Sequence, residues 1–74
     1  MTTYNGHKNW NHWNVSLWIN NDEGLYRFAL DCVRRSLGRK GAVEMFLNGV
    51  STRKTPDGAP YTASSVRAAM VEMR

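Results

Sequence analysis

Few side chains in this sequence have the type and spacing that catalysis or metal binding requires. Cys32 is the strongest nucleophile, but it falls on the apolar side of a predicted helix, where a buried small hydrophobic residue is the better interpretation. His7 and His12 could share a metal ion with Cys32, but this spacing matches no zinc pattern, so we interpret both as surface histidines. The 6 Asp and Glu residues are scattered, and no glycine-rich phosphate loop is present. We therefore expect a protein that is not an enzyme and that needs no cofactor or metal.

The basic residues are more informative. The chain has 10 Lys and Arg against 6 Asp and Glu, a net charge of +4, which favours anionic partners. The cations that we take as candidate partner-binding residues are Arg34, Arg35, Arg39, Lys40, Arg53 and Lys54. Part of this group has an ordinary explanation, because cations favour helix C-termini and Arg35 follows Asp31 by one turn. The last four have no acidic partner nearby in the sequence, so a solvated surface and a binding face both stay open.

The tryptophans also have two interpretations. Trp10, Trp13 and Trp18 are close together and would supply the large apolar side chains that a small domain needs for its core. Alternatively, one ring is exposed as an anchor for a partner, since binding hot spots are enriched in Trp. Trp18 is set off from the stripe formed by the other two. We therefore add Trp18 to the candidate partner-binding residues.

Length and composition predict one folded domain spanning residues 1–74. Its 74 residues are 42% hydrophobic, too apolar for a disordered segment. Helical spacing predicts an all-α bundle of three or four helices packed around the tryptophans. The predicted segments are an irregular arm (1–8), a tryptophan-rich helix (9–20), a main helix (22–37), a short helix (42–48), a loop (51–61) and a C-terminal helix (62–74).

The tryptophan-rich segment is the ambiguous one. Its apolar residues nearly alternate with polar ones, which is a strand pattern, and a strand there would give an α+β fold. As a helix, the segment places Trp10, Trp13 and Leu17 on one stripe, with Asn9 as the N-cap. We predict the helix, because no second convincing strand is present.

The remaining boundaries follow from capping and turn residues. Asn21 or Asp22 can cap the main helix, and Thr62 or Ser64 can cap the last one. Pro56-Asp57-Gly58 predicts a turn within the loop. For the core, the spacing of apolar residues predicts joint burial of Trp13, Leu17, Phe28 and Cys32.

Cysteine content and hydropathy predict a cytoplasmic protein. A single cysteine cannot form an internal disulfide and fits a reducing compartment. The first ten residues lack the pattern of a signal peptide, and no apolar stretch approaches the roughly 20 residues that a membrane span needs. We therefore expect no membrane partner.

The N-terminal third carries a recognisable set of motifs: Tyr4-Asn5-Gly6, Asn9-Trp10, Trp13, Leu17-Trp18-Ile19 and Asn21-Asp22-Glu23. They resemble a signature of small uncharacterised bacteriophage and mobile-element proteins, which usually reads YNG, then NYETW, then LWxxNDE. The sequence departs from it at Asn11-His12, where Glu-Thr is usual. The resemblance implies a phage or mobile-element origin and no established activity.

Small accessory phage proteins often inhibit host defence, as anti-CRISPR and antirestriction proteins do. The resemblance, together with the small size, the lack of a catalytic constellation and the basic residues, leads us to expect an anti-defence inhibitor that binds a host protein or nucleoprotein complex in the host cytoplasm. The positive charge argues against an acidic DNA mimic. The alternatives are a small basic nucleic-acid-binding regulator and, because a short chain buries little surface, a homodimer.

Overall fold

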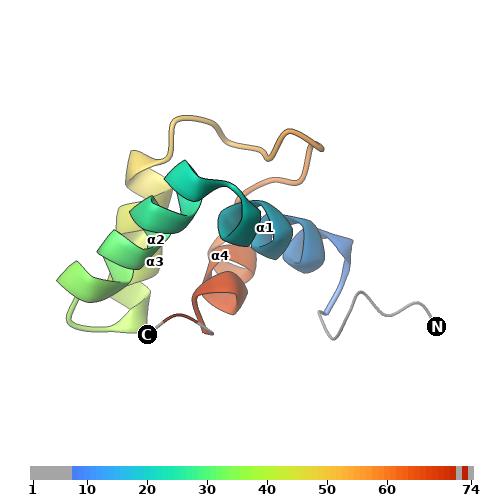
Figure 1. Ribbon diagram of the computed structural model, residues 1–74. Helices are drawn as coiled ribbons and strands as arrows, with labels where there is room; N and C mark the ends of the chain where they lie inside the picture. The colour runs from blue at the N-terminus through green and yellow to red at the C-terminus, as the bar shows by residue number, and fades with distance from the viewer. Residues whose placement is uncertain (1–7, 72, 74) are drawn as a thin grey trace.

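The structure, a computed structural model, describes residues 8–71 and 73. These residues form four helices and no named strand: α1 (Trp10–Asn21), α2 (Glu23–Arg35), α3 (Arg39–Gly49) and α4 (Ala63–Met70) (Figure 1). The predicted all-α class is confirmed, and the strand alternative for the tryptophan-rich segment is wrong. Most of the arm predicted at 1–8 lies outside the described residues.

Three of the helices begin at the residues that the sequence indicates. The side chain of Asn9 accepts a hydrogen bond from the backbone N–H of His12 at 3.0 Å and so caps α1. Asp22 ends α1 and caps α2 by accepting from the backbone N–H of Leu25 at 3.0 Å. Thr62 and Ser65 form a reciprocal capping box at the start of α4. Each cap satisfies a backbone donor that has no partner within its own helix.

The third helix is longer than the predicted segment 42–48. It begins at Arg39, after an N-cap glycine, Gly38, that makes no side-chain capping bond. The sequence offers no capping signal at this point, which explains why the start was placed too late. As a result Arg39 and Lys40 lie in the first helical turn and not in a connecting segment. The last helix ends earlier than predicted, at Met70.

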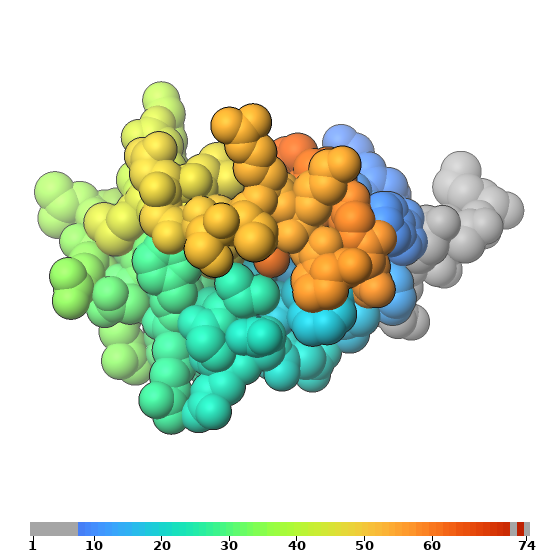
Figure 2. Space-filling model, turned by 90° about the horizontal axis from the view of Figure 1, so that it is seen from above, coloured from blue at the N-terminus to red at the C-terminus, as the bar shows by residue number. Residues whose placement is uncertain are grey.

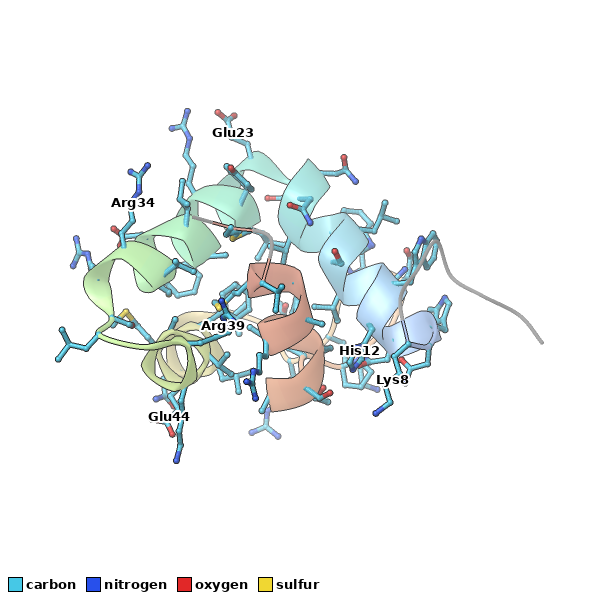
Figure 3. All side chains as sticks on the ribbon, turned by 90° about the horizontal axis from the view of Figure 1, so that it is seen from below. Lys8, His12, Glu23, Arg34, Arg39 and Glu44 are labelled. Atoms are coloured by element: carbon cyan, nitrogen blue, oxygen red, sulfur yellow. The ribbon has the colours of Figure 1, made fainter. Side chains whose placement is uncertain are left out.

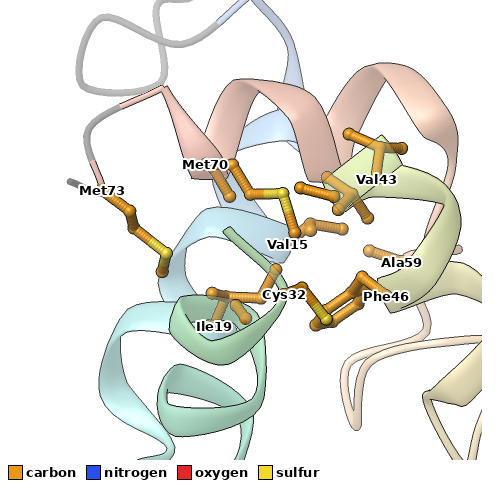
Figure 4. Close-up of a cluster of buried hydrophobic side chains, with 12 residues drawn as sticks. Val15, Ile19, Cys32, Val43, Phe46, Ala59, Met70 and Met73 are labelled. Carbon is orange, nitrogen blue, oxygen red and sulfur yellow. The ribbon is translucent and has the colours of Figure 1, made fainter. Parts of the chain in front are cut away.

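The core lies where the four helices meet (Figure 4). Helix α1 packs against α2 and α4, and α3 packs against the same two helices. Phe46 is fully buried, with its ring centroid 5.2 Å from that of Phe28 and 5.6 Å from that of Tyr61. Cys32 is also fully buried, as predicted, and burial raises the pKa of its thiol, which is therefore neutral at physiological pH.

The prediction that the helices pack around the tryptophans is wrong. Val15 and Ile19 are the fully buried apolar residues of α1, whereas Trp10 is 39% and Leu17 37% exposed. Trp13 is half-buried. The sequence of α1 has two apolar stripes, and the helix turns inward the one that contains Val15 and Ile19.

Polar residues explain this orientation of α1. His12, Asn14 and Ser16 lie on the inward side and would argue against burial if they lacked partners. The ring of His12 is 2.8 Å from the hydroxyl of Ser64, and Asn14 is hydrogen-bonded to the loop before α4. His12 is therefore a buried tie between α1 and α4, and its assignment as a surface histidine is wrong. His7 lies outside the described residues.

The loop from Val50 to Thr62 runs across the top of the helices from the end of α3 to the start of α4 (Figure 1). Its predicted turn is present, because the backbone N–H of Gly58 donates to the carbonyl of Thr55 at 2.8 Å. Gly58 has φ of 94°, a left-handed conformation that glycine adopts without strain. The loop is thus an ordered part of the fold, and Figure 2 shows it lying across part of the upper side of the molecule.

Candidate functional site

Two adjoining hollows lie on the side of the molecule formed by α3, the loop and α4. The smaller, about 290 Å³, is lined by Lys40, Val43, Glu44, Leu47, Ala63 and Arg67. The larger, about 480 Å³, is lined by Leu47, Val50, Ser51, Thr52, Arg53, Lys54, Pro60 and Tyr61. Leu47 belongs to both, so the hollows form one surface, which we call the α3–α4 face.

Helical spacing places the α3 side chains of this face. Lys40, Glu44 and Leu47 are four and three residues apart, so they project from the same side of the helix. Lys40 and Glu44 are exposed, whereas Leu47 is half-buried against the core. This side of α3 therefore places one half-buried apolar side chain, Leu47, next to two exposed charged ones.

The charge of the face is predominantly positive. Lys40, Arg53, Lys54 and Arg67 are exposed, and Glu44 is the carboxylate residue among the lining side chains. The ion pairs found in the described part of the chain, Glu23–Arg27 and Asp31–Arg35, both lie on α2. None of the four cations of the face therefore forms an ion pair with a carboxylate of the described residues, although Glu44 lies among them.

Three of the six predicted basic residues come together at this face, namely Lys40, Arg53 and Lys54. The other three do not join them. Arg34 and Arg35 lie in the last turn of α2, where Arg35 is paired with Asp31 at 3.0 Å. Figure 3 shows Arg34 and Glu44 projecting from opposite sides of the molecule.

Arg39 also lies apart from the face. It lines a different hollow, of about 240 Å³, together with Leu37 and Met70. Figure 3 places it between α3 and α4 on the underside of the molecule. One helical position thus separates Arg39 from Lys40 but turns the two side chains to different sides. The predicted basic cluster is not a single surface.

The structure gives Trp18 a different place from the one expected. Its indole N–H donates to the carboxylate of Asp57 at 2.9 Å, and its ring is half-buried. The same carboxylate oxygen accepts from the side-chain amide of Asn14 at 2.9 Å, and these hydrogen bonds lower the pKa of Asp57. Trp18 therefore holds the loop on α1. It also lines another hollow, of about 430 Å³, which adjoins the larger hollow of the α3–α4 face through Val50, Ser51, Thr52 and Tyr61.

The same network positions the cations of the loop. The hydroxyl of Thr55 donates to the side-chain oxygen of Asn14 at 2.6 Å, and the side-chain amide of Asn11 donates to the carbonyl of Pro60 at 2.8 Å. Lys54 and Pro60 are joined across the loop by a backbone bridge. These contacts fix the backbone on both sides of the turn and therefore fix the positions of Arg53 and Lys54.

Arg67 is the member of the face that is not among the partner-binding residues predicted from the sequence. It is the one cation within α4, and an isolated arginine gives no pattern by itself. Its partner across the hollow, Lys40, was placed in a connecting segment because α3 was started at residue 42. A helix begun at Arg39 would have shown Lys40, Glu44 and Leu47 as one stripe.

Metal binding finds no support in the structure of residues 8–71 and 73, since no group of three His, Cys, Asp or Glu side chains there could hold a metal ion. None of the helices among those residues is long and apolar enough to cross a bilayer.

The comparisons with known proteins give a family without an activity. Residues 1–74 match the model of a family described as "Family of unknown function (DUF7249)". Neither the curated proteins nor the solved structures hold a significant match to the chain.

Proposed function

We propose that this chain, which belongs to the DUF7249 family, is a non-enzymatic binding protein that acts on a host protein through its α3–α4 face. The observation that carries the proposal is that the two adjoining hollows combine an apolar floor, formed by Leu47, Val50 and Tyr61, with exposed cations. These cations form no ion pair with the described residues. Protein interfaces have this anatomy, an apolar centre surrounded by a polar rim.

The apolar floor favours a protein over a nucleic acid as the partner. Leu47, Val50 and Tyr61 are half-buried and present part of their surface to the larger hollow. Protein–nucleic acid interfaces are more polar and more strongly positive, because they are built around phosphate contacts. In the α3–α4 face, by contrast, the cations lie beside an apolar surface that a phosphate backbone would not use.

We further propose that the host protein belongs to a defence complex, which the chain inhibits by direct binding in the host cytoplasm. This part of the proposal rests on the resemblance of residues 4–26 to small phage and mobile-element proteins. A basic inhibitor suits an acidic surface of a nuclease or surveillance complex, because opposite charges speed association and favour the correct partner.

Co-purification from host cells tests this function. Tagged wild-type protein should bring down a host protein in stoichiometric amount and should lower CRISPR or restriction activity in the same cells. The variant Lys40→Glu/Arg67→Glu should lose both effects. Absence of a stoichiometric partner together with unchanged defence activity would refute the proposal.

A second function, that of a small basic nucleic-acid-binding regulator, is favoured by one feature of the fold. Only residues 36–38 separate α2 from α3, and Arg39 and Lys40 follow in the first turn of α3. Helix-turn-helix proteins join two helices by such a turn and reach base edges with the start of the second helix. This function predicts duplex binding that weakens steeply as salt rises and that is lost in Arg39→Glu/Lys40→Glu.

A further inference from the structure

We infer that the α3–α4 face binds an acidic segment of its protein partner, in which large apolar side chains are flanked by carboxylates. The inference rests on the proposed function, because it names the chemistry of the partner at the same surface. Its basis is the placement of Lys40, Leu47 and Arg67 around one hollow.

Charge complementarity selects the acidic character of the segment. Lys40 on α3 and Arg67 on α4 belong to the two helices that border the smaller hollow, and Arg53 and Lys54 border the larger one. Both ion pairs of the described residues are confined to α2, so these cations are available to carboxylates of a partner. A basic segment would meet like charges along the same rim, which is a strong penalty against binding.

The apolar floor of the two hollows favours large apolar side chains in the bound segment. Leu47 is shared by the two hollows, and Tyr61 packs edge-on against the buried ring of Phe46 at 5.6 Å. A floor supported by the core in this way keeps its shape. Binding energy in protein interfaces is concentrated where large side chains fill such hollows.

Glu44 allows a prediction of whether affinity for an acidic segment rises or falls when one residue of the same face is changed. It lies one turn after Lys40 on α3 and lines the smaller hollow with Lys40 and Arg67. A carboxylate at this point opposes an acidic segment, although the net charge of the rim still attracts it. Neutralising Glu44 should therefore tighten the binding, whereas it should do nothing if the segment binds elsewhere.

The experiment selects displayed random peptides on the intact wild-type chain and then measures the affinity of the enriched peptides by fluorescence polarisation. The test variant is Lys40→Glu/Arg67→Glu. The matched control is Lys8→Glu/Arg34→Glu, which makes the same charge change at two exposed cations that do not line the face. Circular dichroism melts confirm folding, and Lys40→Gln/Arg67→Gln replaces the test variant if charge reversal unfolds it.

We expect the enriched peptides to combine Asp or Glu with Leu, Phe or Met. Their dissociation constant should rise about tenfold or more in the test variant and change by less than about twofold in the control, since a charge outside an interface acts only over a distance. Glu44→Gln should lower the dissociation constant of the peptides.

Five results would overturn the inference: no enriched peptide, peptides without acidic residues, equal weakening in the two double variants, an unchanged affinity in Glu44→Gln, or displacement of the peptide by a DNA duplex. The proposed function can fail separately. If a host protein co-purifies equally with wild type and with Lys40→Glu/Arg67→Glu, the chain is a host-directed binding protein that uses another surface. If acidic peptides bind as expected but no host protein co-purifies, the inference stands and the function fails.

Discussion

The indole nitrogen of Trp18 lies 2.9 Å from a carboxylate oxygen of Asp57, although the two residues are 39 positions apart in the sequence. This hydrogen bond, with the one from Asn14, joins the middle of α1 to the tip of the loop. Since the same loop carries Arg53 and Lys54, it also sets where two cations of the α3–α4 face lie.

Removing the acceptor should therefore destabilise the fold. We expect Asp57→Ala to lower the melting temperature, because the side-chain amide of Asn14, a residue that is only 1% exposed, loses its acceptor. Asp31→Ala is the matched control, since its ion pair with Arg35 is exposed and such pairs contribute little. Equal melting temperatures for the two variants, measured by circular dichroism, would show that the loop is not held by Asp57.

The hydrogen bonds to Asp57 also predict a dependence on pH. They lower its pKa in the folded chain below the ordinary value of 3.8, so the unfolded chain binds the proton more tightly. The stabilisation is thus complete above the unfolded pKa and is lost as the pH falls through the folded pKa. The melting-temperature difference between wild type and Asp57→Asn should be constant above about pH 5 and shrink below about pH 4. A difference that grew on acidification would contradict this assignment.

The sequence predicted the helical class and most helix starts, because caps and turns are local signals. Asn9, Asp22 and Thr62 each bond a backbone N–H a few residues away, and Gly58 completes a four-residue turn. The inward side of α1 was not predictable in this way. It depends on Asn14 and His12 finding partners 43 and 52 residues later in the chain.

Two alanine substitutions test which apolar residues form the core. Phe46→Ala should cost about 3–5 kcal/mol of unfolding free energy, because the ring is fully buried between Phe28 and Tyr61. Leu17→Ala should cost less than about 1 kcal/mol, because that side chain is 37% exposed. Chemical denaturation measures both. If Leu17→Ala lowered the unfolding free energy more than Phe46→Ala, the core would contain Leu17, as the sequence analysis predicted.

Two glycines of α3 should respond to alanine with opposite signs. A Cβ atom at Gly49 would lie 2.6 Å from the ring of Phe28, so Gly49→Ala should destabilise the fold by about 1–3 kcal/mol. At Gly41 the nearest atom, Cβ of Ser36, is 3.6 Å away, and Gly41→Ala should stabilise the helix by up to about 1 kcal/mol. Denaturation midpoints of the two variants on the same side of wild type would contradict the packing of α3 on α2.

Only part of the α3–α4 face could be predicted from the sequence, because some of its residues are brought together by the packing of helices. Lys40, Arg53 and Lys54 were identified because we saw no obvious acidic partner nearby in the sequence, although Glu44 follows Lys40 by one helical turn. Arg67 joins them only through the packing of α3 against α4. Arg39 was selected for the same reason as Lys40, but it projects to a different side of α3. Arg34 was included because it is near these residues in the sequence, although the turn at residues 36–38 separates it from them.

The most direct test compares two triple charge reversals for binding to the co-purified host protein. Lys40→Glu/Lys54→Glu/Arg67→Glu removes cations of the α3–α4 face, and Lys8→Glu/Arg34→Glu/Arg39→Glu makes the same change in net charge at exposed cations elsewhere. We predict that the first variant weakens binding about a hundredfold and that the second changes it by only a few fold, because charges outside an interface act mainly through long-range attraction. Equal weakening by the two variants, or a greater loss in the second, would contradict the assignment of binding to the α3–α4 face.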